Sequence, residues 1–143
     1  MKVAGIILAA GASSSMEGQN KLIINIADKP VLVWVVEAAV SAGLDPIIVV
    51  SGYDDATTGN IIAELPVDIV FNNRWEEGMS TSFTPAINML PSTVQGVTIL
   101  LGDMPAVDSY IIKILDYQFA ASGGKKIVHP VFDGQQGNPV VFP

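Results

Sequence analysis

The chain has 143 residues, half of them apolar and 15% charged, with a formal net charge of -7 and no cysteine. This composition indicates one folded domain with a single core and excludes an intrinsically disordered chain. The acidic balance argues against a nucleic-acid partner, which usually needs a basic stripe. The lack of cysteine excludes disulfides, thiolate metal sites and cysteine nucleophiles. No apolar run reaches the roughly 20 residues that span a bilayer, so we expect a cytoplasmic protein with no membrane partner.

The chain begins with an apolar run at residues 3–8 that shows no period-2 alternation. This pattern predicts a strand buried on both faces. A signal peptide is the rival interpretation, because small residues follow at Ala9 and Ala10. We disfavour it because the run is short and leads into a Gly/Ser turn and an amphipathic segment.

Short β-branched runs then alternate with helical stretches along the chain. Further strands are predicted at residues 46–50, 67–71 and 97–101, and helices at 30–42, 54–65, 80–90 and 108–121. Pro30 opens the first helix and Gly43 ends it, while Asp54 and Asp108 are candidate N-caps. Two short strands, at 127–129 and 139–142, are predicted around a Gly-rich turn. The order predicts an α/β fold, a three-layer α/β/α Rossmann-like domain with a mostly parallel sheet.

In such a sheet, ligands bind beyond the carboxyl ends of the strands. The loop after the first strand, at residues 11–19, is rich in glycine and serine, and Lys21 follows it. Small residues let backbone N–H groups approach an anion, and a lysine can place its charge on phosphate oxygens. The spacing matches neither a Walker P-loop nor a G-x-G-x-x-G fingerprint. We interpret it as a phosphate-binding loop; a flexible turn with a solvated lysine is the alternative.

The segment after the third strand, at residues 72–82, is a turn that runs into a predicted helix. Exposed N–H groups at that helix start and the hydroxyls of Ser80, Thr81 and Ser82 can together bind an anion. Ordinary helix capping is the simpler alternative.

The fourth strand runs directly into Gly102-Asp103-Met104-Pro105. A carboxylate at the end of a buried strand is costly unless it is paired or bound to metal, and magnesium prefers such hard oxygen ligands. Gly102 allows a close approach of the backbone. We therefore predict Asp103 as a ligand of Mg²⁺, with a turn or capping role as the alternative. The only histidine, His129, is expected to be a core or turn residue.

Three segments carry a resemblance to the MobA-like NTP transferases. Leu8-Ala9-Ala10-Gly11, followed by Ser13, Met16 and Lys21, resembles the family's L-A-A-G-x-S-x-R-M-G…K signature. Asn72, Trp75, Gly78, Met79 and Ser82 match its N-P-x-W-x-x-G-M-x-x-S segment, and Gly102-Asp103-Met104-Pro105 matches its metal-binding motif. Ala10 is similar to the alanine of the molybdenum cofactor cytidylyltransferase branch.

The resemblance implies a domain of the nucleotide-diphospho-sugar transferase type that transfers CMP from CTP to the phosphate of molybdopterin and releases pyrophosphate. It implies Lys21 and Asp103 as catalytic residues and Mg²⁺ on Asp103. The implied nucleotide-binding residues are Leu8, Ala9, Ala10, Gly11, Ser13, Lys21, Asn72, Gly78, Ser82 and Gly102.

Two departures from the family pattern leave the activity open. Ser15 stands where the family has an arginine, and Glu17 stands where it has a glycine. Losing a guanidinium removes a bidentate phosphate clamp, and a nearby carboxylate repels a triphosphate. Two alternatives therefore remain. One is a related transferase that uses GTP or a sugar or lipid phosphate acceptor, and the other is a non-catalytic nucleotide- or pterin-binding module.

The organisation of the whole protein is also an expectation drawn from the family. Members usually continue further and bring another aspartate that shares the metal. We therefore expect residues 1–143 to be a single nucleotidyltransferase domain that lacks its C-terminal portion. A homo-oligomer, or a partner enzyme that receives the product, remains open.

Overall fold

The computed structural model describes residues 1–11 and 21–143, so Ser13, Ser15 and Glu17 lie outside the described residues. Its centre is a five-stranded sheet in the order β5-β4-β1-β6-β9. In chain order the strands are β1 (Val3–Ala9), β4 (Ile47–Ser51), β5 (Asp68–Phe71), β6 (Gly96–Leu101) and β9 (Val140–Phe142). The first four run parallel, and β9 pairs antiparallel with β6. The predicted mostly parallel sheet is confirmed.

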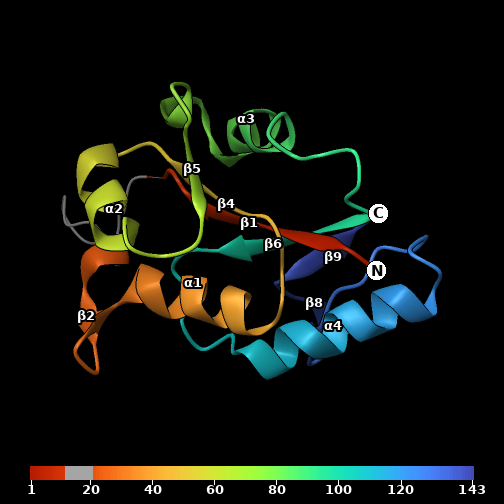
Figure 1. Ribbon diagram of the computed structural model, residues 1–143. Helices are drawn as coiled ribbons and strands as arrows, with labels where there is room; N and C mark the ends of the chain where they lie inside the picture. The colour runs from red at the N-terminus through yellow and green to blue at the C-terminus, as the bar shows by residue number, and fades with distance from the viewer. Residues whose placement is uncertain (12–20) are drawn as a thin grey trace.

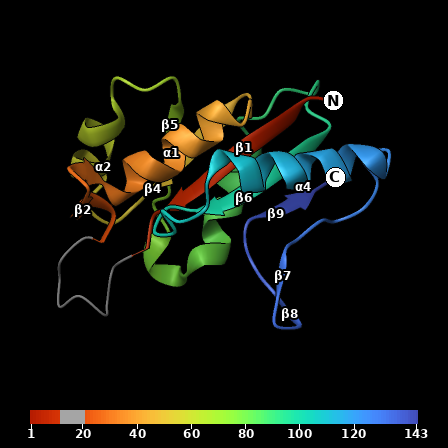
Figure 2. The same ribbon diagram turned by 90° about the horizontal axis from the view of Figure 1, so that it is seen from below.

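Helices cover both faces of the sheet, as the predicted three layers require (Figure 1). The helices α1 (Val31–Ser41) and α4 (Ser109–Ala121) lie side by side on one face, as the view from below also shows (Figure 2). The helix α2 (Asp55–Ile62) contributes Ile62 to the same core. The short helix α3 (Phe83–Ile87) packs on the opposite face. Among the described residues, no helix combines the length and apolarity needed to cross a membrane.

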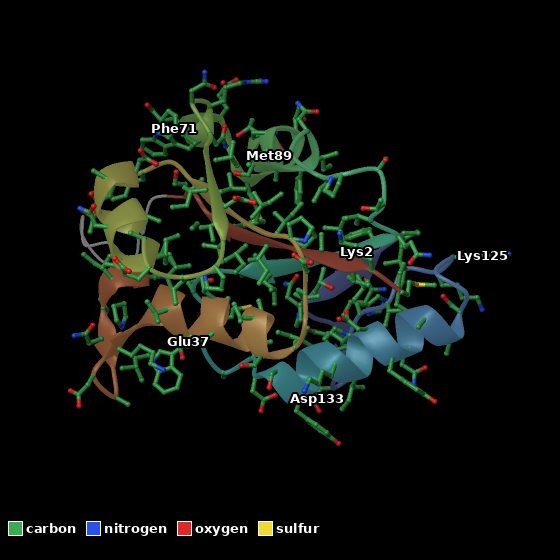
Figure 3. All side chains as sticks on the ribbon, viewed as in Figure 1. Lys2, Glu37, Phe71, Met89, Lys125 and Asp133 are labelled. Atoms are coloured by element: carbon green, nitrogen blue, oxygen red, sulfur yellow. The ribbon has the colours of Figure 1, made fainter. Side chains whose placement is uncertain are left out.

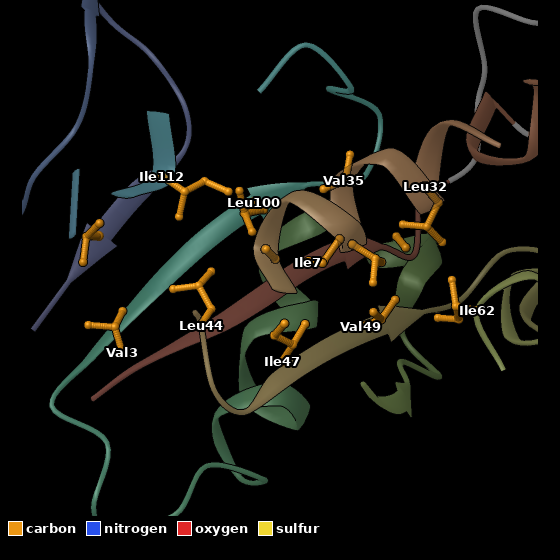
Figure 4. Close-up of a cluster of buried hydrophobic side chains, with 14 of the residues drawn as sticks. Val3, Ile7, Leu32, Val35, Leu44, Ile47, Val49, Ile62, Leu100 and Ile112 are labelled. Carbon is orange, nitrogen blue, oxygen red and sulfur yellow. The ribbon is translucent and has the colours of Figure 1, made fainter. Parts of the chain in front are cut away.

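The core divides into two layers because successive side chains of a strand point to opposite faces. In β1, Val3 and Ile7 pack with the residues of α1 and α4, and this layer is drawn in Figure 4. Ile6 and Leu8 of the same strand pack toward α3. All seven residues of β1 are buried, which is why the sequence reads there as a continuous apolar run. Side chains fill the space on both sides of the sheet (Figure 3).

Several boundaries differ from those predicted. The helix expected at 80–90 is a 3-10 turn, Met79–Ser82, followed by only five residues of α-helix. The strand expected at 127–129 is reduced to one bridge between Val128 and Val141, and Pro130 follows without the N–H that a ladder needs. Asp108 caps α4 as predicted, since its carboxylate accepts a hydrogen bond from the Ile111 N–H at 3.0 Å. Asp54 precedes α2 but makes no side-chain capping bond.

Two small hairpins were not predicted. The strands β2 (Asn25–Ile26) and β3 (Lys29–Pro30) form one, and β7 (Val131–Phe132) and β8 (Gln135–Gln136) form the other. Both turn through residues with positive φ, and in the second these are Asp133 and Gly134. An Asp-Gly pair favours a type I′ turn, so the second hairpin left a signal in the sequence.

One polar pair, Thr98 and Asp116, joins β6 to α4. The hydroxyl of Thr98, which is fully buried, lies 3.1 Å from a carboxylate oxygen of Asp116 and donates to it. Burial raises the pKa of the Asp116 carboxyl to about 6, and the hydrogen bond from Thr98 opposes part of that rise. The folded chain therefore binds a proton at Asp116 more tightly than the unfolded chain does.

This raised pKa predicts a pH dependence of stability. Because the folded-state pKa lies above the unfolded value of 3.8, the stabilisation is complete below about pH 4 and is lost as pH rises through about 6. Asp116→Asn should flatten this part of the profile. The check is the free energy of unfolding in urea at several pH values. Asp68→Asn, at an exposed position, should keep the wild-type slope; equal slopes for all three proteins would contradict the prediction.

Candidate functional site

The parallel register brings the ends of four strands to one edge of the sheet. Ala9 pairs with Ser51, Ser51 with Phe71, and Leu8 with Leu101. The chain runs along β1 from right to left in Figure 1, so this edge lies at the left of that view. The loops that follow β1, β4, β5 and β6 therefore start beside one another, although they are far apart in the sequence.

A cavity of about 460 Å³ opens at this edge, a size suited to a small-molecule ligand. It combines one lysine and two carboxylates with an apolar wall. Its lining residues are Leu8, Ala9, Ala10, Gly11, Lys21, Leu22, Trp75, Glu76, Gly78, Met79, Ser82, Leu101 and Asp103. Eight predicted site residues are among them: Leu8, Ala9, Ala10, Gly11, Lys21, Gly78, Ser82 and Asp103. The structure thus brings Lys21 and Asp103 to one cavity from opposite parts of the chain.

Gly102 has a packing role beside the cavity. Its N–H donates to the Leu8 carbonyl at 3.0 Å. A Cβ atom at this position would lie 3.0 Å from that carbonyl oxygen and 3.2 Å from the Leu32 Cδ1. Glycine therefore lets the end of β6 lie close to β1, which sets the position of the adjacent Asp103.

The loop after β4 also contacts residues that line the cavity, although no motif in the sequence points to it. The Tyr53 N–H donates to the Ala10 carbonyl at 2.9 Å, and its ring meets Trp75 edge-to-face at 5.5 Å. A Cβ atom on Gly52 would lie 2.6 Å from the Trp75 Cβ and 2.7 Å from the Ala10 oxygen. Only glycine fits at this spacing. In the sequence, the one feature that could have indicated this loop is therefore a glycine directly after a strand.

Asn72 organises the loop after β5. Its side chain is buried, and both amide hydrogens are used: they are donated to Thr81 Oγ1 at 2.8 Å and Ser82 Oγ at 3.0 Å. Its amide oxygen accepts the Arg74 N–H at 2.9 Å. Asn72 is not among the residues that line the cavity; it lines a second hollow together with Phe71, the last residue of β5. A direct contact between Asn72 and a nucleoside stays a prediction; in this structure Asn72 positions Ser82.

The amide bonds of Asn72 predict a local loss of stability on truncation. Asn72→Ala leaves the Arg74 N–H and the Ser82 hydroxyl without these partners, so we expect it to cost about 1–3 kcal/mol. Urea unfolding measures this cost. The exposed neighbour supplies a matched control, because Asn73→Ala should change stability by well under half as much. Equal effects of the two variants would contradict the role of Asn72.

The charged residues of the cavity suit a metal ion that is bound together with the phosphates of a substrate. Among the residues described, no group of three or more His, Cys, Asp or Glu side chains could hold a metal ion by itself. Asp103 is exposed and lines the cavity that Lys21 also lines. Magnesium commonly takes one or two carboxylates together with substrate phosphates, and the donor at Asp103 suits that mode. His129 borders a different hollow at the end of α4.

A ligand cavity at the carboxyl edge of a parallel sheet, with glycine-rich backbone, a lysine and an aspartate, defines a nucleotide-handling class of α/β protein. The particular family is shown by its sequence model. Residues 5–143 match the MobA-like NTP transferase domain, and the chain belongs to that family.

Curated relatives share a limited identity with the chain. The "Bifunctional protein GlmU" of Caldanaerobacter subterraneus subsp. tengcongensis is 29% identical over 139 residues, which cover 95% of this chain and 30% of that protein. The "2-C-methyl-D-erythritol 4-phosphate cytidylyltransferase" of Prochlorococcus marinus is 34% identical over 100 residues, which cover 66% of this chain and 43% of that protein. The chain thus spans less than half the length of either relative.

Solved structures share the fold. The crystal structure of Rv0371c from Mycobacterium tuberculosis H37Rv is 24% identical, with a TM-score of 0.84, and the match covers 99% of this chain and 71% of that chain. A complex of Rv0371c with manganese is 22% identical, with a TM-score of 0.78 and the same coverage. At these identities, the two matches show a shared fold and nothing further.

Proposed function

We propose that the protein is a nucleotidyltransferase that transfers CMP from CTP to the phosphate of molybdopterin. One observation carries the proposal: in a chain of the MobA-like NTP transferase family, Lys21 and Asp103 line one cavity at the carboxyl edge of the sheet. The cytidylyltransferase name of the Prochlorococcus relative supports CTP as the donor. We expect this chemistry in the cytoplasm, where nucleoside triphosphates are made.

The proposed reaction needs no covalent enzyme intermediate. An oxygen of the acceptor phosphate forms a bond to the α-phosphorus of CTP, and the bond from that phosphorus to the bridging oxygen of the β-phosphate breaks. Pyrophosphate leaves with the electron pair of that bond. Catalysis of such a step consists of positioning and charge neutralisation.

The residues of the cavity have separate roles in this proposal. Lys21 places a positive charge on the phosphates, and the backbone of Ala10 and Gly11 supplies N–H donors. Ser82 orients the nucleoside, held by its hydrogen bond from Asn72. Asp103 would hold Mg²⁺, which when bound neutralises charge on the phosphate oxygens. The manganese complex of Rv0371c supports a divalent ion in this fold.

A single assay separates this function from its rivals. Pyrophosphate release is measured with CTP and with GTP, each with molybdopterin, a sugar phosphate or a lipid phosphate as acceptor. We expect release with CTP and molybdopterin, and no release with GTP. Release with GTP, or only with a sugar or lipid phosphate, would assign the protein to a related transferase. Nucleotide binding without release, even in a Ser15→Arg variant, would make it a non-catalytic module.

Asp103 provides the sharpest test of the metal role. Asp103→Asn keeps the size of the side chain but removes the charge that attracts a hard cation. We expect magnesium-dependent pyrophosphate release to fall by about 100-fold or more, with unchanged thermal unfolding. Asp68→Asn, on the exposed edge of β5, is the control and should retain full activity. Full activity in Asp103→Asn would remove this residue from the site.

A further inference from the structure

The two adjacent glutamates of the loop after β5 have different surroundings. Glu77 is bound by Arg74, with Nε to Oε2 at 2.8 Å and Nη2 to Oε1 at 3.0 Å. That pair holds the pKa of Glu77 below its usual range through the hydrogen bond from Arg74. Glu76 instead lines the cavity, and within residues 1–11 and 21–143 its carboxylate has no hydrogen-bond or ion-pair partner. Glu76 is therefore an exposed residue of the cavity lining, and among the described residues nothing occupies its carboxylate as a hydrogen-bond acceptor.

The position of Glu76 is unfavourable for a wall that holds phosphates. A carboxylate repels a polyphosphate, and of the charged lining residues only Lys21 among the described positions is basic. The side chains next to Glu76 in the wall are apolar: Trp75, which also packs into the core layer beneath α3, and Met79. An aromatic face beside a hydrogen-bond acceptor suits a flat ring that carries an N–H donor.

Resting on the proposed function, we infer that Glu76 accepts a hydrogen bond from the exocyclic amino group of the nucleotide's base. Carboxylates accept from the N4 amino group of cytosine. Uracil carries an oxygen at the same place, which a carboxylate repels. Glu76 is therefore a specificity-determining residue that favours an amino-bearing pyrimidine over the keto-bearing one, by attraction to the first and repulsion of the second.

The wall that carries Glu76 is preformed, as discrimination between two similar rings requires. The Thr81 hydroxyl accepts from Asn72 and lies 2.7 Å from the Gly78 carbonyl, to which it can donate. Gly78 has a φ of 116°, a conformation that L side chains rarely adopt. The Gly78 N–H closes the turn by donating to the Trp75 carbonyl at 3.3 Å. These bonds limit the freedom of the backbone on both sides of Glu76.

The test compares CTP and UTP, which differ at the relevant edge of the ring. Their dissociation constants are measured by calorimetry, with magnesium present, for the wild type, Glu76→Gln and Glu77→Gln. We expect the wild type to prefer CTP by about 10-fold, as the loss of one charged hydrogen bond implies. In Glu76→Gln the preference should shrink toward unity, because glutamine can also donate to the uracil oxygen. Glu77→Gln should keep the wild-type ratio.

The outcomes distinguish this inference from the function on which it rests. If the wild type binds neither nucleotide, the proposed function fails. If it binds CTP but Glu76→Gln keeps the wild-type ratio, only the role of Glu76 is overturned. Equal tightening of both nucleotides in Glu76→Gln would also overturn it, since that result assigns Glu76 to general repulsion of phosphate.

Discussion

Hydrogen-bond registration between the parallel strands is the constraint on which the rest of this structure depends. The ladders that join β5, β4, β1 and β6 end nearly level, so four loops leave the sheet at one edge. A shift of two residues in one ladder would keep the buried faces apolar but would move a whole loop by about 7 Å. The arrangement of the sheet therefore explains why loops from distant parts of the chain, with Lys21 and Asp103, line one cavity.

The loops are held by polar bonds that the apolar core does not supply. Asn72 joins both ends of its loop, while Tyr53 and Gly52 fix Ala10 against Trp75. The hydrogen bonds of Asn72 and Tyr53 pair polar groups of the loops, and the absence of a side chain at Gly52 allows the close approach. The wall of the cavity is thus shaped before a ligand arrives, which lowers the ordering cost of binding.

The charged residues of the cavity come from different loops of a chain whose net charge is -7. Lys21 follows the loop after β1 and Asp103 follows β6, whereas Trp75 and Glu76 come from the loop after β5. A polyanion approaching an acidic protein needs local compensation, which a lysine, backbone N–H groups and a divalent ion can provide. An acidic residue in the third loop is consistent with recognition of the uncharged part of a nucleotide.

The sequence by itself determined the α/β class, the strand and helix order, and the three segments that form most of the cavity. It did so because apolar periodicity, capping residues and small-residue loops are local signals, of which Asp108 and residues 3–8 are examples. Only the tertiary structure decided the role of Gly52, the place of Glu76 in the cavity lining, and the shortened helix after Ser82. The first two bring together loops that are distant in sequence, and no local pattern encodes such contacts.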